Sequence, residues 1–347
     1  MSRTLFLFSI AFFSITLFSS CDEQAAQGNG NRAYLPSYIG QSGEVAIIVE
    51  TDLWNGSVGD SLKKELRRPI PLMPAYEPMF DLYQHPPSTF TKTLKPFRNI
   101  IHIDIADNIN YKDPQLKVVK EKYAKDQLMF KIGVTSKKAF HELFQDNVDE
   151  IIRMINEAEV ERTIKYFKRF NNAEVREKIA KDHNVRVLIP DNTDLLENRE
   201  NFVWASRDMS RNKDGRMHDV QQGILIYHYP YVDDSTFTKD YLLNVRDSVL
   251  KANVPGPVDS SWMTTSYVYE PAYEPINLND KYATEIRGLW RVENAFMGGP
   301  FISVSQVDEK RGRVVTVEGY VFAPKFDKRE YMRELEAVVK SIEFEGE

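Results

Sequence analysis

Serine and lysine side chains occur at one spacing that could support acyl transfer. Ser61 and Lys64 are separated as in the S-x-x-K element of penicillin-recognising enzymes, where the serine hydroxyl is the nucleophile. The S-D-N and K-T-G elements that complete such a site do not occur in the chain. We therefore expect both residues on a solvated helix start. We keep open the alternative of a hydrolase whose site is assembled from sequence-distant residues around Ser61 or His102.

Histidine and carboxylate side chains give no complete metal or acid–base motif. Residues 141–145 read HELFQ, which begins like the zinc-protease helix but has glutamine where the second histidine must stand. His102 and Asp104 lie two residues apart, so on a strand they would share a face and the carboxylate could orient the histidine as a base. The same alternation fits a plain solvent-exposed face. Phosphate loops, dinucleotide fingerprints and calcium loops are absent from the sequence, and we predict no metal and no cofactor.

Aromatic side chains form the more suggestive pattern. Tyr227, Tyr229 and Tyr231 alternate along one segment, so they would share one face of a strand, and Trp262 and Trp290 lie in the same half of the chain. Exposed aromatic rings can stack on sugars or contact a partner protein. These five residues are the candidate ligand or partner surface. The alternative is that the tyrosine row packs beneath a helix as core.

The single cysteine of the chain, Cys21, follows an export signal. Arg3 precedes a run of apolar and small residues, 5–18, which is shorter than the roughly twenty residues needed to cross a bilayer. Residues 18–21 read FSSC and resemble a bacterial lipobox, in which a peptidase cleaves before the cysteine and the sulfur receives a diacylglyceryl group. The alternatives are an ordinary secretory signal and an uncleaved anchor helix. The solitary cysteine at the end of the apolar run favours lipidation of Cys21.

The lipobox interpretation sets the expected location of the protein. Residues 1–20 would be a signal peptide, and residues 21–42 a flexible tether rich in alanine, glycine, asparagine and glutamine. Two or more acyl chains anchor a protein stably, whereas one chain binds a membrane only marginally. We therefore expect a cell-envelope protein held by its N-terminal lipid, at the outer membrane and on its periplasmic or surface face. With the one thiol lipidated, no disulfide could form.

Charge limits the kinds of partner that the protein can bind, and length predicts its number of domains. The 347 residues carry a formal net charge of −6, with acidic and basic residues interspersed. Because the chain has no basic stripe, we predict no nucleic-acid binding. The length favours two domains, which we place at 43–183 and 184–347, with a helical segment at the end of the first.

Hydrophobic periodicity predicts an α+β fold with antiparallel sheets and helices packed on one face. Strands are expected at 44–50, 98–105, 127–134, 185–189, 202–206, 223–231, 262–269, 282–292, 301–306 and 314–322. Ser136 can cap a helix whose apolar stripe continues to Phe167, and residues 238–253 form another helix. In the closing helix, Asp327 is the expected cap, with Glu330 completing a capping box.

The region between the first two predicted strands, 44–50 and 98–105, is irregular. Residues 69–96 contain seven prolines, which predicts a long excursion with at most one short strand. Its pentamer PAYEP, at 74–78, recurs at 271–275. The two copies stand at different points relative to the predicted strands, so we interpret the repetition as coincidence or as convergent turn chemistry.

Two resemblances add to this pattern. The lipobox, the motifs GLW at 288–290 and MGGPF at 297–301, and the closing helix resemble a family of Bacteroidota lipoproteins catalogued only as a domain of unknown function. That resemblance implies no activity. The element order of the second half is similar to the fold of the photosystem-II oxygen-evolving protein and of Ran-binding Mog-type proteins, and a shared fold implies no shared function.

The sequence therefore predicts a lipid-anchored envelope protein that acts as a non-enzymatic binding or assembly module. Its partner would be an envelope protein or a glycan. The alternative is the envelope hydrolase described above. A pocket that joins a histidine, a carboxylate and a hydroxyl would favour the enzyme, whereas an exposed aromatic patch without them would favour the binder.

Overall fold

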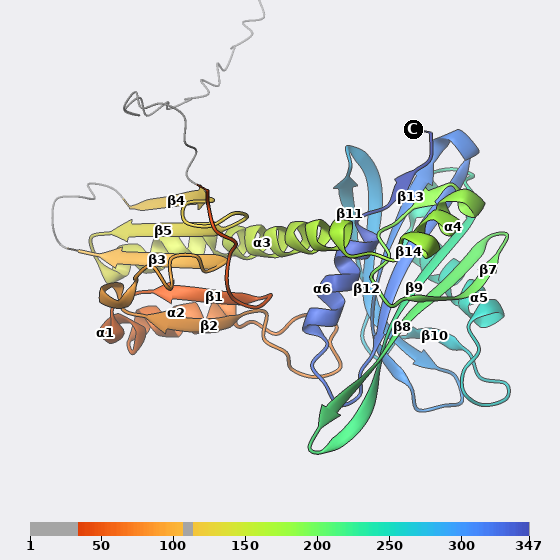
Figure 1. The fold of residues 1–347 in the computed structure, drawn as a ribbon, viewed down its shortest axis with the longest axis horizontal. Coiled ribbons are helices and arrows are strands. Elements are labelled where there is room, and N and C mark those ends of the chain that lie inside the picture. Colours follow the sequence, from red (N-terminus) through yellow and green to blue (C-terminus); the bar gives the residue numbers. More distant parts are fainter. Residues whose placement is uncertain (1–33, 107–113, 347) are drawn as a thin grey trace, which may run out of the picture. The chain divides into compact units, whose positions relative to one another are not determined.

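The computed structural model describes residues 34–106 and 114–346. Figure 1 shows its two large sheets and the helices beside them. Cys21, the expected signal peptide and most of the expected tether lie outside the described residues. Within the described ranges, every helix is too short or too polar to span a bilayer.

The N-terminal sheet has five strands in the order β2-β1-β3-β5-β4. These strands are β1 (Glu44–Ile48), β2 (Asp81–His85), β3 (Asn99–Ile105), β4 (Gln115–Lys120) and β5 (Leu128–Val134). β1 pairs in parallel with β2 and β3, β3 pairs in parallel with β5, and only β4 is antiparallel to its neighbour. The expectation of antiparallel pairing was wrong for this sheet.

The physical reason for the parallel pairing is visible in the sequence of β1. Residues 45–49 are apolar without interruption and all are fully buried, which is typical of a strand covered on both faces. The chain also makes long connections between β1, β2 and β3, and parallel neighbours require such crossovers.

Three helices belong to this first sheet: α1 (Thr51–Trp54), α2 (Ser57–Leu66) and α3 (Lys137–Arg169). The start of α3 is confirmed, because the Ser136 side chain accepts a hydrogen bond from the Ala139 N–H at 3.2 Å. Apolar residues of α2 and α3, among them Leu62, Phe140 and Phe144, pack into the same core as Ile101 and other sheet residues. The helix stripe therefore covers one face of the sheet, as its spacing predicted.

The C-terminal sheet has eight antiparallel strands in the order β10-β12-β13-β14-β9-β8-β7, with β11 also paired to β12. They are β7 (Asp194–Arg199), β8 (Phe202–Lys213), β9 (Arg216–Pro230), β10 (Met263–Ser266), β11 (Ala272–Leu278), β12 (Lys281–Val292), β13 (Gly298–Asp308) and β14 (Arg313–Phe322). A further small sheet pairs β6 (Val185–Arg186) with β15 (Glu343–Phe344). The α+β class and the division into two parts are confirmed.

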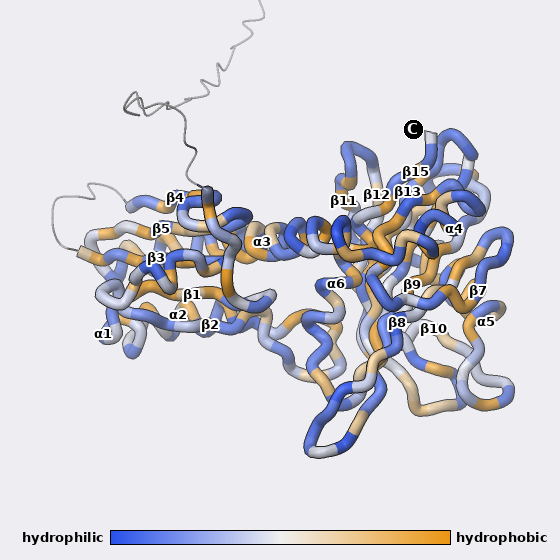
Figure 2. Tube along the Cα trace, in the orientation of Figure 1, coloured by the Kyte–Doolittle hydropathy of each residue, from blue (hydrophilic) through white to orange (hydrophobic). Residues whose placement is uncertain are grey.

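Helices cover both faces of this second sheet rather than one. Ile224 and Ile226 of β9 share a core with α4 (Ala173–His183) and α6 (Arg329–Val339). Leu225 and Tyr227, which point to the opposite face, share another core with α5 (Lys239–Asn253). Apolar residues accordingly run along the strands of this sheet (Figure 2). The prediction of helices on one face was wrong here, because consecutive β9 residues are apolar on both sides.

The closing helix α6 is capped from far away in the sequence. Its expected cap, Asp327, makes no capping hydrogen bond. Instead the buried carboxylate of Glu77 accepts the Lys328 and Arg329 N–H groups, each at 2.7 Å. A negative charge at a helix N-terminus satisfies unpaired donors and stabilises the helix dipole. The predicted capping box was therefore wrong, and the proline-rich segment supplies the cap.

Candidate functional site

The structure separates the five aromatic residues of the predicted surface. Tyr227 is 3% exposed and Trp290 is 2% exposed, and both pack in the core beneath α5. The Trp290 indole N–H donates to the Val321 carbonyl at 3.2 Å. As surface residues these two were predicted wrongly, because α5 covers the sheet face that they share.

Tyr229 and Trp262 occupy intermediate positions. Tyr229 is half-buried with its ring 6.2 Å from that of Tyr241 on α5, and burial raises the pKa of its hydroxyl. Trp262 immediately precedes β10, and the Lys251 ammonium lies 4.7 Å from its ring centroid. Neither lines the cleft described next, so only the last tyrosine of the row contributes to a concave site.

Tyr231, just beyond β9, lines a cleft of about 600 Å³ in the C-terminal part of the chain. Three other segments complete it: the short helix η2 (Asp234–Phe237), the turn between β11 and β12, and the end of β13 with the following η3 (Glu309–Arg311). The lining residues are Tyr231, Asp234, Phe237, Asp280, Lys281, Tyr282, Gln306, Val307 and Glu309. The volume is within the usual range of small-molecule sites, roughly 300–1,000 Å³.

Three aromatic rings form the apolar part of this aromatic cleft. The rings of Phe237 and Tyr282 meet edge to face, with centroids 5.3 Å apart and planes at 84°. The Tyr231 ring also contacts Phe237, with centroids 6.2 Å apart and planes at 55°. Phe237 is buried, whereas Tyr282 is 53% exposed. The three rings are therefore inclined to one another rather than coplanar, and the Tyr282 ring is accessible to a ligand.

Local backbone chemistry fixes these rings. Asn279 and Asp280 both have positive φ, 55° and 61°, as the two-residue type I′ hairpin turn requires. That turn brings Asp280 and Tyr282 to the cleft. On the opposite side, the Asp233 carboxylate accepts the Ser235 N–H at 2.9 Å and starts η2. The Tyr273 hydroxyl donates to the Phe237 carbonyl at 2.7 Å, which joins β11 to η2.

Carboxylates form the polar part of the aromatic cleft. Asp234, Asp280 and Glu309 are all exposed, against one lysine, Lys281. Asp234 accepts a hydrogen bond from the Tyr231 hydroxyl at 2.8 Å, and this bond raises the pKa of Tyr231. Among the described residues, no salt bridge joins any of the three carboxylates to a cation. The arrangement can hold a ligand by ring contact and by negative charge.

Of the residues that complete this cleft, sequence reasoning found only Tyr231. Phe237 and Tyr282 are separated by more than forty positions and meet through tertiary packing. One local signal was available, since the Asn279-Asp280 pair between two strand-like segments is a hairpin turn sequence. The predicted strand 282–292 already began at Tyr282, and recognising β11 would have added the hairpin turn beside it.

The residues of the hydrolase alternative are only partly brought together. Ser61 lies 3.0 Å from Nδ1 of His141, and Nε2 of the same ring lies 3.1 Å from the Ser57 hydroxyl. Lys64 is mostly exposed and pairs with Glu65. No described carboxylate hydrogen-bonds to His141, so the ring lacks the group that orients the base in a catalytic triad.

His102, the other residue of that alternative, stands apart. It is half-buried on β3 with its ring 5.9 Å from Phe90, and burial lowers its pKa. No hydrogen bond of the described residues joins it to Ser61, whose histidine partner is His141. The discriminating trio of histidine, carboxylate and hydroxyl is not assembled at either candidate residue.

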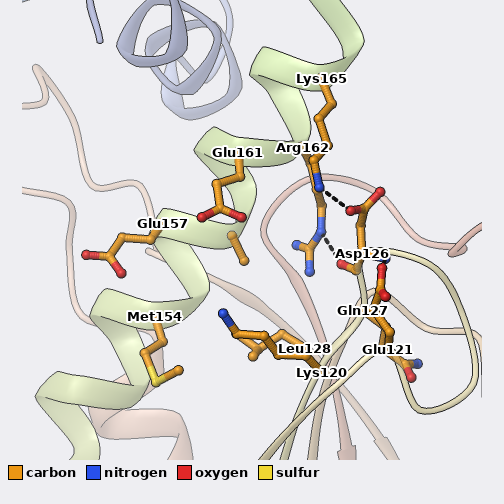
Figure 3. Close-up of a pocket in the computed structure, with 11 residues that line it drawn as sticks. Lys120, Glu121, Asp126, Gln127, Leu128, Met154, Glu157, Glu161, Arg162 and Lys165 are labelled. Carbon is orange, nitrogen blue, oxygen red and sulfur yellow. Dashed lines mark hydrogen bonds and ion pairs between the residues drawn. The ribbon is translucent and has the colours of Figure 1, made fainter. Parts of the chain in front are cut away.

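A second cleft, of about 250 Å³, lies between α3 and the turn that joins β4 and β5 (Figure 3). Its charged side chains are largely engaged with one another. Lys165 forms an ion pair with Asp126, and Arg162 donates from Nε to the Asp126 carbonyl at 2.8 Å. The eleven lining residues include no aromatic ring, histidine, serine or cysteine. This cleft therefore has no aromatic stacking surface and no hydroxyl or thiol nucleophile of serine or cysteine.

Comparison with known proteins gives families without an assigned activity. Residues 172–341 match the family model DUF4837 and residues 38–168 match DUF8532, each described as a domain of unknown function. No curated protein matches the chain.

Solved structures give only distant similarities. A mutant of protein Mog1 is 12% identical, with 46% of this chain and 90% of that chain covered and a TM-score of 0.29. The Saccharomyces cerevisiae Ran-binding protein Mog1p is 11% identical over the same shares, with a TM-score of 0.31. A Bacteroides thetaiotaomicron protein is 12% identical, with 47% of each chain covered and a TM-score of 0.20. These similarities assign no function.

Proposed function

We propose that this chain, which matches two domains of unknown function, DUF8532 and DUF4837, is a lipid-anchored cell-envelope protein that binds a ligand without converting it. The ligand is an envelope protein or a glycan, taken up by the aromatic cleft. Lipid at Cys21 holds the folded part at the outer membrane.

The observation that supports binding is the accessible ring of Tyr282 above the buried ring of Phe237. Aromatic side chains offer a large contact area at a low cost in conformational entropy, and Tyr adds a hydroxyl that remains wet. Carboxylates beside the rings, of which Asp234 accepts a hydrogen bond from Tyr231, add directional polar contacts. Such a mixed lining is typical of ligand sites.

Binding is tested by comparing two exposed tyrosines. Tyr282→Ala removes a cleft ring, whereas Tyr166→Ala removes a ring of α3 that is 56% exposed and lies outside the cleft. The lipidated proteins are purified from native membranes, and bound molecules are identified by mass. We expect wild type and Tyr166→Ala to retain the same partner and Tyr282→Ala to lose it. Retention by all three proteins would contradict binding through the cleft.

The anchor is supported by the sequence FSSC and by the solitary cysteine. Cys21→Ser replaces the sulfur that would carry the lipid, so the protein should move from the membrane pellet to the soluble fraction. Ser19→Ala, two residues earlier, retains the small residue that the peptidase requires and should stay in the pellet. Membrane fractions separated by density test the outer-membrane assignment. A Cys21→Ser variant that remains with the lipid refutes the anchor.

A hydrolase remains the second candidate because Ser61 contacts a histidine. If His141 activated Ser61, the wild-type protein would react with a fluorophosphonate probe. Labelling would then disappear in Ser61→Ala and persist in Ser57→Ala. We expect no labelling, since the ring lacks an orienting carboxylate. Labelling that depends on Ser61 would favour the enzyme over the binding protein.

A further inference from the structure

Building on the proposed binding role, we infer that the ligand of the aromatic cleft carries a protonated or quaternary amine. The amine would lie against the Tyr282 ring, between the carboxylates of Asp280 and Glu309. The same chemistry is offered by a small free amine and by a lysine side chain of a partner protein.

The charge of the lining favours a cation. Three carboxylates face one lysine in the aromatic cleft. The buried Asp308, next to Glu309 in the chain, is paired closely: it contacts Arg311 and Arg313 at 3.1 and 2.9 Å. By contrast, Asp280 and Glu309 make no salt bridge with a described cation. A cationic ligand would supply the missing partner, and an anionic one would be repelled.

The rings favour a cation as well. The negative face of an aromatic ring attracts an ammonium group within about 6 Å of its centroid. Phe237 and Tyr282 stand at 84° to each other, so the edge of one ring packs against the face of the other, and the half-exposed Tyr282 is the ring that a ligand can reach. Ring walls with carboxylates at the rim are the arrangement that recognises alkylated ammonium groups. A neutral sugar could also stack here, but it would leave the carboxylates without a counter-charge.

The test compares a cation with its neutral isostere. Choline and 3,3-dimethylbutan-1-ol have nearly the same shape and differ in charge. In amide NMR titrations of the folded protein, we expect choline to shift residues of η2 and the β11–β12 turn and to bind at least about tenfold more tightly than the alcohol. Raising the salt concentration from about 0.05 to about 0.5 M should weaken choline binding and leave the alcohol unchanged.

Substitutions test whether choline binding depends on the carboxylates and on the Tyr282 ring. Asp280→Asn with Glu309→Gln should weaken choline binding about tenfold, whereas Asp259→Asn, an exposed acid outside the cleft, should not. Tyr282→Leu should weaken binding, and Tyr282→Phe should retain it, because phenylalanine keeps the ring face. All four positions are exposed, and unchanged thermal melting verifies that the variants fold.

Further ligands distinguish a free amine from a lysine side chain of a partner protein. They also distinguish failure of the amine inference from failure of the proposed binding function. A tripeptide with a central lysine, compared with its norleucine counterpart, tests a protein-borne amine in the same way. Equal affinity for charged and neutral members of both pairs overturns the inference. So does a neutral N-acetylglucosamine trimer that binds the same residues at least as tightly, although the proposed binding function then stands. Failure of the Tyr282→Ala comparison above would instead remove the binding function itself.

Discussion

Arg246 and Glu318 form a buried ion pair inside the C-terminal core. The guanidinium donates from Nε and Nη2 to the two Glu318 oxygens at 2.8 and 2.7 Å, and from Nη1 to Thr265 at 2.8 Å. It also lies 3.7 Å from the Phe301 ring centroid. Because both charges are removed from water, each depends on the other for stabilisation.

Glu318→Gln should therefore destabilise the protein strongly. The substitution keeps the side-chain volume but removes the bidentate partner of the buried Arg246, whose remaining counter-charge is the partly exposed Asp247 at 3.6 Å. Breaking a buried pair in this way costs up to about 3–5 kcal/mol. Arg246→Met combined with Glu318→Leu should recover most of the loss, since it removes both charges together. Urea unfolding measures each free energy. A loss below about 1 kcal/mol for Glu318→Gln would contradict the role of the pair.

His228, on β9, makes stability depend on pH. Burial, then the positive charge of Arg313, then His183 lower its pKa from an ordinary 6.5 to about 4, while Asp308 acts in the opposite direction. Between pH 6.5 and 4 the unfolded chain binds a proton that the folded chain does not, so stability is complete above 6.5 and falls as the pH decreases.

His228→Asn should reduce this pH dependence. We expect the difference in unfolding free energy between pH 7 and pH 4.5 to be smaller in the variant than in wild type, because one proton fewer is taken up on unfolding. Urea unfolding at the two pH values checks this. An identical difference in both proteins would show that His228 titrates alike when folded and unfolded.

Among the elements, α6 shows how a helix with a clear sequence signal can be completed by a distant residue. Its apolar residues pack on the sheet as their spacing predicted. Its N-terminus, however, is capped by Glu77 of the first PAYEP pentamer. Glu274, at the same place in the second pentamer, is exposed on β11. The same pentamer sequence therefore has different structural roles at its two positions.

This pair gives a matched test. Glu77→Ala should lower the unfolding free energy by about 1–2 kcal/mol, the usual cost of losing a cap. Glu77→Gln keeps an acceptor without its charge and should lose less. Glu274→Ala should change stability by no more than about 0.5 kcal/mol, as is usual for an exposed residue. Equal effects of the two alanine substitutions, measured in urea, would contradict capping by Glu77.

At the scale of the whole molecule, contacts with α6 join the two parts of the chain. The Arg329 guanidinium contacts the Asp81 carboxylate at 2.5 Å and donates to the Pro78 carbonyl at 2.9 Å. Arg333, mostly buried, donates to the Met79 carbonyl at 2.7 Å. Since these donors and acceptors come from both parts, the parts should unfold together.

Removing the Glu77 and Arg329 contacts should weaken the coupling between the two parts of the chain. In wild type we expect the slowest-exchanging amides of β3 and β5 to match those of β13 and β14 in opening free energy within about 1 kcal/mol. In Glu77→Ala with Arg329→Ala, which keeps the Arg333–Met79 hydrogen bond, the two sets should differ by more than about 1 kcal/mol, since fewer contacts then couple the parts. Hydrogen exchange followed by NMR measures both sets. Unchanged, equal values in the variant would show that other contacts maintain cooperativity.

The sequence by itself determined the α+β class, the long helix begun by Ser136 and the shared face of the tyrosine row. These features depend on neighbours in the chain, because strand and helix repeats and a capping hydroxyl act over a few residues. The pattern could not tell whether the face carrying Tyr227 met water or α5, since both alternatives have the same alternation.

Tertiary structure decided the strand directions of the first sheet, the cap of α6 and the composition of the aromatic cleft. Tyr231 was predictable, but Phe237, Tyr282 and the carboxylates come from segments far apart along the chain. Which surfaces become buried, and which side chains meet, depends on how packed elements cover one another. That covering is a non-local property, and no short repeat in the sequence encodes it.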